Sequence, residues 1–142
     1  MTETTLAAIG PYTFELVKSD RGISKVKILK EPSSKGKNPN TKIVQIENLL
    51  DAPVAAEGTE FQRKVWNATR KIPYGETRTY AQIAAQIGHP KAVRAVGTAL
   101  GKNPVCVIVP CHRVVPSGGG IGQYAYGAAM KRWLLDHEAK RA

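Results

Sequence analysis

A thiol and an imidazole stand side by side at one point of this 142-residue chain. Cys111 follows Pro110 and is followed at once by His112 and Arg113. A thiolate is a strong nucleophile, and positive charge nearby lowers the pKa of a cysteine from its free value of about 8.5. The order of these residue types predicts that Cys111 is a reactive cysteine. The alternative is a buried structural thiol, because cysteine is among the most buried residue types.

An apolar run, VCVIV, precedes this group at residues 105–109. It predicts a buried strand that ends at Pro110, so that Cys111 lies at a strand terminus. Cys106 lies within the run and is expected to be a small core residue. Two cysteines five residues apart on a strand point to opposite faces, so we expect neither a disulfide nor a metal site.

The positive charge of the chain is concentrated in its second part. Residues 1–57 hold eight basic and seven acidic side chains, whereas residues 58–142 hold thirteen basic and four acidic ones. This excess predicts a polyanionic partner, nucleic acid, with a basic surface that only aids solubility as the alternative. We therefore expect a short N-terminal α+β domain over 1–57 and a second domain over 58–142 that binds DNA.

The composition is that of an ordinary globular protein, with 42% hydrophobic residues. No apolar run approaches the roughly 20 residues of a membrane span. The N-terminus lacks the basic and then apolar regions of a secretory signal. We expect an intracellular protein without a membrane partner, in the cytoplasm or nucleoid of a prokaryote or in the nucleus of a eukaryote.

The first part of the chain is expected to begin with strands. Within residues 11–30, the sequences YTFELVKS and GISKVKIL alternate with period two and flank the turn signal SDRG. Residues 30–42, rich in Pro, Gly, Ser and Asn, predict a loop. Residues 43–53 predict a short helix that ends before Pro53.

The second part is expected to be mainly helical. Capping boxes that begin at Thr59 and Thr79 predict the starts of two helices. The helix after Thr79 ends at Gly88, and a further helix is expected over residues 91–100, with Pro90 at its start. Two short helices joined by a tight turn are typical of a helix-turn-helix.

The outer face of the 91–100 helix is expected to carry Lys91, Arg94, Ala95 and Thr98. Small side chains with one or two cations allow a helix to lie close to DNA, although the same face could pack on another helix. The residues expected to point inward are Val93, Val96 and Leu100. After the cysteine, a Gly-rich loop carries tyrosines and lacks the pattern of a nucleotide-binding loop, and a last helix ends the chain.

The sequence PCHRVV, preceded by GKNPV and followed by GGIGQYAYG and KRWLLDHE, resembles the alkylguanine-DNA alkyltransferases, also called methylated-DNA–protein-cysteine methyltransferases. The resemblance covers residues 59–139 in order, from FQRKVW through IPYGETRTYAQIA and AVRAVGTAL to WLLDHE. It implies an α+β fold in which a small N-terminal domain with strands precedes a mainly helical domain with a helix-turn-helix and an active-site strand or loop.

The resemblance also implies an activity. Members of this family flip an alkylated guanine out of duplex DNA and transfer the alkyl group from its 6-oxygen to their own cysteine, once per molecule. The implied partner is double-stranded DNA carrying alkylated guanine, bound through its minor groove by a monomer. No cofactor and no metal are implied, and residues 1–57 contain neither Cys nor His for the zinc site that some members have.

The catalytic roles follow residue by residue. Cys111 is the implied alkyl acceptor, His112 the base that acts through a water, and Glu138 the group that orients His112. Tyr80 is implied to donate a hydrogen bond to a guanine ring nitrogen. Arg94 is implied to enter the base stack where the guanine has left.

The other residues that the resemblance assigns to guanine or DNA binding are Asn103, Val114, Tyr124, Ala125, Lys131, Ala95 and Thr98. Asn103 is implied to tie the helix-turn-helix to the active-site strand. The carbonyls of Cys111 and Val114 are implied to bind the guanine amino group. Tyr124 is expected to form a pocket wall and the N–H of Ala125 to face the 6-oxygen, while Tyr126, where glycine is common, is expected to narrow the pocket.

Three other functions are alternatives. An alkyltransferase-like lesion sensor binds damaged DNA but has lost the cysteine, whereas Cys111, His112 and Glu138 are all present here. A thiol hydrolase needs a distant histidine and an oxyanion hole and gives the basic charge no role. A plain DNA-binding protein would make the cysteine accidental.

Overall fold

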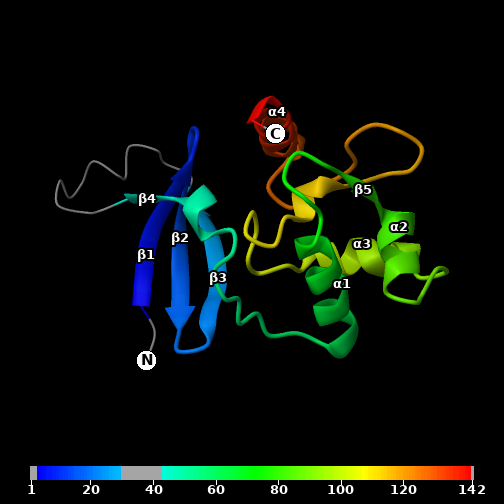
Figure 1. The fold of residues 1–142 in the computed structure, drawn as a ribbon, viewed down its shortest axis with the longest axis horizontal. Helices are drawn as coiled ribbons and strands as arrows, with labels where there is room; N and C mark the ends of the chain where they lie inside the picture. Colours follow the sequence, from blue (N-terminus) through cyan, green and yellow to red (C-terminus); the bar gives the residue numbers. More distant parts are fainter. Residues whose placement is uncertain (1–2, 30–42, 142) are drawn as a thin grey trace. The chain divides into compact units, whose positions relative to one another are not determined.

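The computed structural model describes residues 3–29 and 43–141, and the chain divides into two compact units (Figure 1). The first unit contains the chain up to Glu57 together with Pro104–Ile108, and the second contains Gly58–Asn103 and the chain from Val109 onward. The loop predicted over residues 30–42 lies outside the described residues.

The first unit is built on a four-stranded sheet of order β3-β2-β1-β4. Its strands are β1 (Glu3–Ile9), β2 (Tyr12–Ser19), β3 (Gly22–Leu29) and β4 (Ile43–Gln45). β1, β2 and β3 are antiparallel neighbours, and β4 pairs in parallel with β1. The two strands expected within residues 11–30 are confirmed, whereas β1 and β4 were not predicted.

The helix predicted over residues 43–53 is wrong. Ile43 and Val44 pair with β1 instead, and only one 3-10 turn, η2 (Ile46–Leu49), follows. β-branched residues are favoured in strands. Gly22 then allows the returning chain to lie against β3: its φ is +133°, and a Cβ there would come within 2.4 Å of the Pro53 carbonyl oxygen.

The apolar run at 105–109 is buried throughout, as expected, but it does not form the predicted strand. The chain turns within the run, where the Ile108 N–H donates to the Cys106 carbonyl at 2.8 Å. Val107 adopts a φ of +70°, which an extended strand excludes and which is rare for a β-branched residue. The apolar side chains of the run are buried by a turn rather than by a strand. An apolar run of this length therefore does not by itself predict a strand.

Cys111 therefore does not follow a strand. It opens a 3-10 turn, η3 (Cys111–Arg113), which leads into the two-residue strand β6 (Val114–Val115). β6 pairs in parallel with β5 (Arg78–Thr79), the residues just before the second capped helix. This pairing brings the cysteine turn beside the helix-turn-helix.

The second unit holds four α-helices: α1 (Glu60–Arg70), α2 (Tyr80–Gln86), α3 (Val93–Gly101) and α4 (Ala128–Arg141). Both predicted capping boxes are present, at Thr59 and Thr79. The Trp66 indole N–H of α1 donates to the Ala99 carbonyl of α3 at 2.9 Å. This hydrogen bond attaches α1 to the helix-turn-helix formed by α2 and α3.

The start of α3 differs from the prediction. Residues 89–92 form a turn, closed by the Ala92 N–H and the His89 carbonyl at 2.9 Å, so the helix begins at Val93 rather than at residue 91. Val93 was expected to point inward but is 36% exposed. Val96 and Leu100 are buried as expected.

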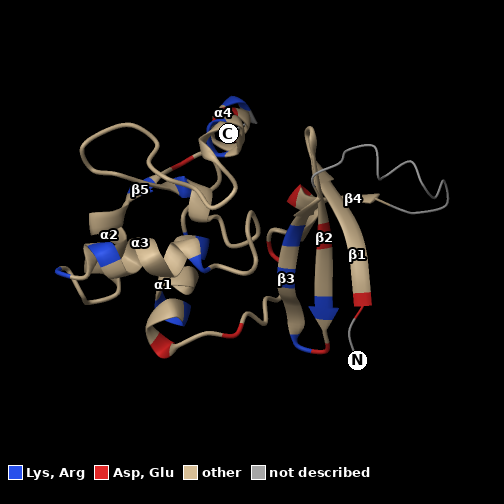
Figure 2. Ribbon diagram, turned by 180° about the vertical axis from the view of Figure 1, so that it is seen from behind, with Lys and Arg blue, Asp and Glu red and all other residues tan. Residues whose placement is uncertain are grey.

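The two units differ in charge. Figure 2 shows acidic and basic residues mixed along the strands of the first unit, whereas basic residues predominate on the helices and loops of the second. No helix among residues 3–29 and 43–141 is long and apolar enough to cross a membrane.

Candidate active site

A pocket of about 640 Å³ opens in the second unit between α2, α3 and the Gly-rich loop after β6. This size is typical of a small-molecule site. Its lining residues include Tyr80, Arg94, Thr98, Cys111, Tyr124 and Ala125. Six residues that sequence analysis had singled out are thus brought to one cavity.

The Cys111 side chain lies at this pocket and is nearly buried, with 8% of the residue exposed. Burial raises the pKa of its thiol, against hydrogen bonds from Asn103 and Tyr124 and the positive charge of Lys131, all of which lower it. The expectation that the adjacent His112 and Arg113 lower this pKa is wrong. Sequence neighbours did not decide the direction, because desolvation outweighs every nearby charge.

His112 is fully buried and binds Glu138. Its Nε2 lies 2.8 Å from Glu138 Oε2. Burial lowers the pKa of His112, while Glu138 acts to raise it. The other ring nitrogen, Nδ1, is buried and has no hydrogen-bond partner among the described residues. A neutral imidazole held in this way has one nitrogen left to accept a proton.

Glu138, in α4, is the carboxylate of this cluster. Burial acts to raise its pKa, but the hydrogen bonds and charges of His112 and Arg113 outweigh burial and bring the pKa to about 2. The group is therefore ionised at neutral pH. The structure brings it together with His112 although the two residues are 26 positions apart in the chain.

Arg113 is the residue that sequence reasoning missed. Its Nε and Nη2 donate to the two oxygens of Glu138 at 2.8 and 2.9 Å, and its Nη1 donates to the Ile72 carbonyl at 2.9 Å. The guanidinium also lies 5.2 Å from the centre of the Tyr74 ring. The only feature of the sequence that pointed to a role for Arg113 was its position next to His112. That position suggested an effect on the Cys111 thiol rather than an ion pair with Glu138.

Lys131 is buried behind the pocket wall. Its Nζ donates to the carbonyl of Val114 at 2.8 Å and to that of Gln123 at 3.2 Å, so it connects β6 to the middle of the Gly-rich loop, residues 116–127. It also lies 5.9 Å from the centre of the Tyr80 ring. Burial lowers the pKa of Lys131, and the Cys111 sulfur acts to raise it. The Val114 carbonyl expected to meet guanine is thus already a partner of Lys131.

Tyr80 is the first residue of α2 and presents its side chain to the pocket. Burial, and to a smaller degree Cys111, raise the pKa of its phenol. The phenol therefore stays protonated at neutral pH and can donate a hydrogen bond into the pocket.

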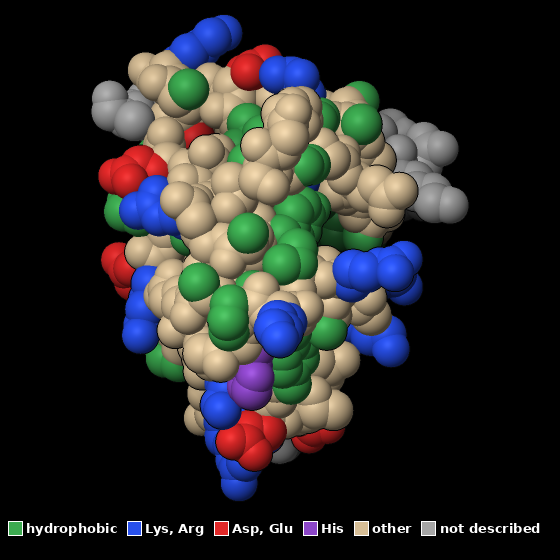
Figure 3. Space-filling model, turned by 90° about the vertical axis from the view of Figure 1, so that its right-hand side faces the viewer, with side chains coloured by type: hydrophobic (Ala, Val, Ile, Leu, Met, Phe, Trp, Pro, Cys, Tyr) green, Lys and Arg blue, Asp and Glu red, His purple; other side chains and the backbone are tan. Residues whose placement is uncertain are grey.

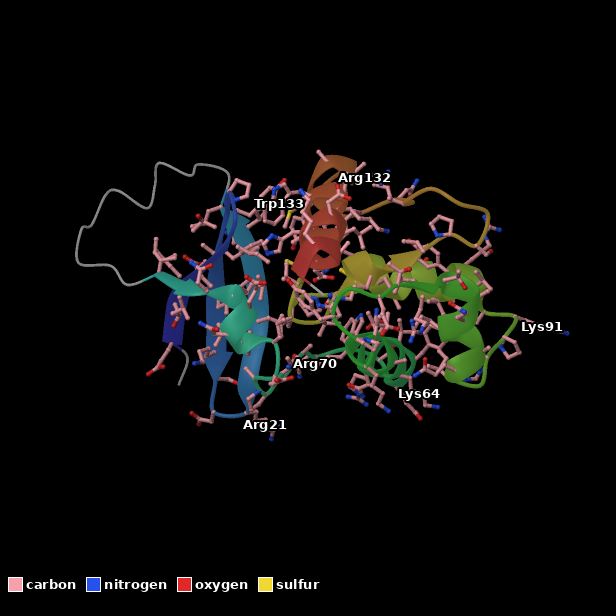
Figure 4. The ribbon with its side chains drawn as sticks, turned by 45° about the horizontal axis from the view of Figure 1, so that its top comes forward. Arg21, Lys64, Arg70, Lys91, Arg132 and Trp133 are labelled. Carbon is pink, nitrogen blue, oxygen red and sulfur yellow. The ribbon has the colours of Figure 1, made fainter. Side chains whose placement is uncertain are left out.

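The exposed face of α3 borders the pocket. Arg94 and Thr98 line it, and Ala95 is exposed on the same helix. In Figure 3 hydrophobic side chains run down the middle of the face shown, with Lys and Arg on both sides of them and also among them in the lower half. Lys91, in the turn before α3, extends away from the helices (Figure 4).

Asn103 lies just after α3 and is buried. Its Nδ2 donates to the Val109 carbonyl at 2.9 Å, which ties the end of the helix-turn-helix to the segment that enters the cysteine turn. Tyr126 does not line the pocket as expected. Its ring contacts that of Tyr124 edge to face, with ring centres 5.7 Å apart, and it is not among the residues that line the pocket.

Neither Cys106 nor Cys111 forms a disulfide. Within the ranges that the structure describes, no three His, Cys, Asp or Glu side chains are grouped so that they could hold a metal ion.

Comparison with known proteins identifies the class. Residues 60–140 match the family model of the 6-O-methylguanine DNA methyltransferase DNA binding domain, which is more than half of the chain. The chain therefore belongs to the 6-O-methylguanine DNA methyltransferase family.

Three comparisons, with two similar proteins, support this assignment. The methylated-DNA--protein-cysteine methyltransferase of Methanosarcina acetivorans is 57% identical over 89 residues, which are 63% of this chain and 57% of that protein. The match thus spans less than two thirds of the length of that relative. The crystal structure of the Mycobacterium tuberculosis O6-methylguanine methyltransferase has a TM-score of 0.79 at 34% identity, over 100% of this chain and 95% of that one. The structure of the M. tuberculosis protein in complex with DNA has a TM-score of 0.78 at 34% identity, over 97% and 94% of the two chains.

Proposed function

We propose that this protein repairs DNA by moving an alkyl group from the 6-oxygen of guanine to Cys111, irreversibly and once per molecule. The observation that carries the proposal is a nearly buried thiol at a pocket, followed in the chain by a histidine whose Nε2 is bound by an ionised carboxylate. The family membership and the names of the relatives agree with it.

The reaction is a displacement at the alkyl carbon. The thiol proton of Cys111 passes through a water to His112, and the sulfur then forms a bond to the alkyl carbon as the bond from that carbon to the guanine oxygen breaks. The bonding electron pair leaves with guanine, which takes up a proton. Tyr80, protonated and at the pocket, donates a hydrogen bond to a guanine ring nitrogen and so stabilises the developing negative charge.

The pocket residues have binding roles in this proposal. The N–H of Ala125 faces the guanine 6-oxygen, Tyr124 forms a wall, and the carbonyls of Cys111 and Val114 bind the guanine amino group. The Val114 carbonyl can do so while it accepts from Lys131, because a carbonyl oxygen has two lone pairs. Asn103 fixes the approach of the chain to Cys111.

DNA binds on the face of α3. Its small and basic exposed residues allow the helix to enter the minor groove, where Arg94 occupies the space of the flipped guanine. Ala95 and Thr98 permit close approach to the backbone. The basic excess of the second part strengthens binding to phosphates. The protein acts as an intracellular monomer in this proposal.

Intact-mass spectrometry after incubation with a duplex that contains O6-methylguanine tests the proposal. We expect the protein to gain the mass of one methyl group, located at Cys111 by peptide mapping, and the duplex to regain guanine. Cys111→Ser should gain nothing, whereas Cys106→Ser is the matched control and should be methylated like the wild type. If the wild type binds the methylated duplex without any mass gain, the lesion-sensor function replaces repair.

A further inference from the structure

Arg113 and His112 are adjacent in the chain but bind the same carboxylate. Glu138 Oε2 lies 2.8 Å from His112 Nε2 and 2.9 Å from Arg113 Nη2, while Oε1 accepts from Arg113 Nε. All three residues are at least 95% buried. One carboxylate thus serves a guanidinium and an imidazole in a site from which water is almost excluded.

This sharing has two consequences for the imidazole. An ionised carboxylate only accepts hydrogen bonds, so His112 must carry a proton on Nε2, and a neutral ring then has its lone pair on Nδ1. The guanidinium also balances the carboxylate charge. Without that balance, a buried carboxylate 2.8 Å from the ring would favour the imidazolium, which cannot accept a further proton.

We propose that Arg113 is a positioning residue that holds Glu138 in a bidentate ion pair and thereby keeps His112 neutral, with its proton on Nε2. The inference deepens the proposed function, since a base for Cys111 must be unprotonated. Arg113 also donates from Nη1 to the carbonyl of Ile72, just after the end of α1. This third hydrogen bond fixes the orientation of the guanidinium toward Glu138.

The charged groups that act on His112 come from two elements. Glu138 and Lys131 lie on α4, and Arg113 belongs to η3. Burial is the largest influence and lowers the pKa of His112; Glu138 raises it, and Arg113 and Lys131 lower it. If Arg113 is removed, Lys131 is the one remaining charge in this group that lowers the pKa of His112, against the rise caused by Glu138.

Nitrogen-15 NMR of the histidine rings tests this role without DNA or alkyl transfer. The chain has three histidines, so His89 and His137 serve as internal references. In the wild type we expect His112 to be neutral with the proton on Nε2 at pH 7 and to stay so below pH 6. In Arg113→Met we expect its titration midpoint to rise by at least about one pH unit, a tenfold change in proton affinity. Arg113→Lys keeps the positive charge but loses the paired donors that bind both oxygens of Glu138. The titration midpoint of His112 should therefore rise less in this variant than in Arg113→Met.

Tyr74→Leu is the matched control, because it removes the ring beside the guanidinium and leaves all its donors in place. His112 should titrate there as in the wild type. The rate of alkyl transfer in Arg113→Met should shift to higher pH by the same interval as the NMR midpoint, with partial rescue in Arg113→Lys.

The inference is overturned if wild-type His112 is charged or carries its proton on Nδ1 at pH 7, a result that needs no variant to fold. It is also overturned if folded Arg113→Met shows the wild-type titration. Normal NMR behaviour without any transfer to Cys111 would instead contradict the proposed function and leave the role of Arg113 supported.

Discussion

The two units bury different kinds of side chain. Among the described residues of the first unit, the buried ones are apolar apart from Thr13, and Phe14, Leu16 and Ile23 are fully buried. In the second, the buried polar and charged residues are Thr69, Asn103, His112, Arg113, Lys131 and Glu138. Burial of a charge is unfavourable unless the charge is paired and hydrogen-bonded. The core of the first unit therefore contributes stability, whereas the core of the second unit also holds the charged side chains of the candidate active site.

The two cysteines, five positions apart in the sequence, differ in the same way as the two units. Cys106 belongs to the first unit and is fully buried, whereas Cys111 belongs to the second and reaches the pocket. Neither forms a disulfide. Their residue type is the same, so the surroundings that each unit provides determine which one can react.

The largest expected effect tests whether buried polarity in the second unit serves catalysis. His112→Gln should lower the rate of methyl transfer by roughly 10² to 10⁴, the usual contribution of a general base. The rate is measured by intact mass in single-turnover experiments. Thr13→Val changes the buried polar position of the first unit and should leave the rate within about twofold. An equal loss in both variants would contradict the contrast.

Glu138→Ala tests the energetic side of the comparison. It leaves Arg113 and His112 buried without their carboxylate, and removal of one partner of a buried ion pair costs about 3–5 kcal/mol of unfolding free energy. Both tryptophans, Trp66 and Trp133, belong to the second unit, so fluorescence during urea unfolding reports on that unit.

Asp136→Ala is the control, because Asp136 is an exposed carboxylate on α4, the helix that carries Glu138, and the same tryptophans report on it. Its effect should be within about 0.5 kcal/mol. A loss below about 1 kcal/mol for Glu138→Ala would show that the buried pair adds little to stability.

Arg94→Ala tests the charge difference between the units. Loss of this pocket-lining cation on α3 should weaken binding to methylated duplex about tenfold and reduce the salt dependence by about one counterion. Fluorescence anisotropy at several salt concentrations measures both. Arg21→Ala, in the turn between β2 and β3, removes a cation from the first unit and should change neither quantity. Equal losses would place DNA binding on both units.

The smallest effect concerns pH. His112 has a pKa below its ordinary value in the folded protein, so the unfolded chain binds a proton that the folded one does not, and stability should fall as the pH drops below about 6.5. Glu138, with a folded pKa of about 2 against an ordinary value of about 4.3, should add a further loss as the pH falls through that interval.

Thermal unfolding followed by tryptophan fluorescence measures this dependence, at about 1.4 kcal/mol per unit of pKa difference. His112→Gln should remove the loss that begins near pH 6.5 and keep the one below pH 4.3. A wild-type melting temperature constant from pH 7 to pH 4 would contradict the prediction.

Local sequence determined the helical half of the molecule well. The capping boxes at Thr59 and Thr79 are built from residues three positions apart, and both form as expected. The alternation in β2 and β3 was readable for the same reason, since a hairpin pairs neighbouring segments. β4 was missed because it pairs with a strand more than thirty residues earlier and is only three residues long. β1 was missed although it forms a hairpin with β2, because its sequence, ETTLAAI, shows no clear polar–apolar alternation.

The sequence by itself determined which residues could do chemistry: the Cys111–His112 pair, the basic second part and the order of family motifs around them. Only the tertiary structure decided how they act. Burial set the direction of the Cys111 pKa. The fold joined Arg113 to a carboxylate 25 positions away, and Lys131 to the carbonyls of Val114 and Gln123. Desolvation and through-space pairing depend on packing in three dimensions, which no local pattern of residues encodes.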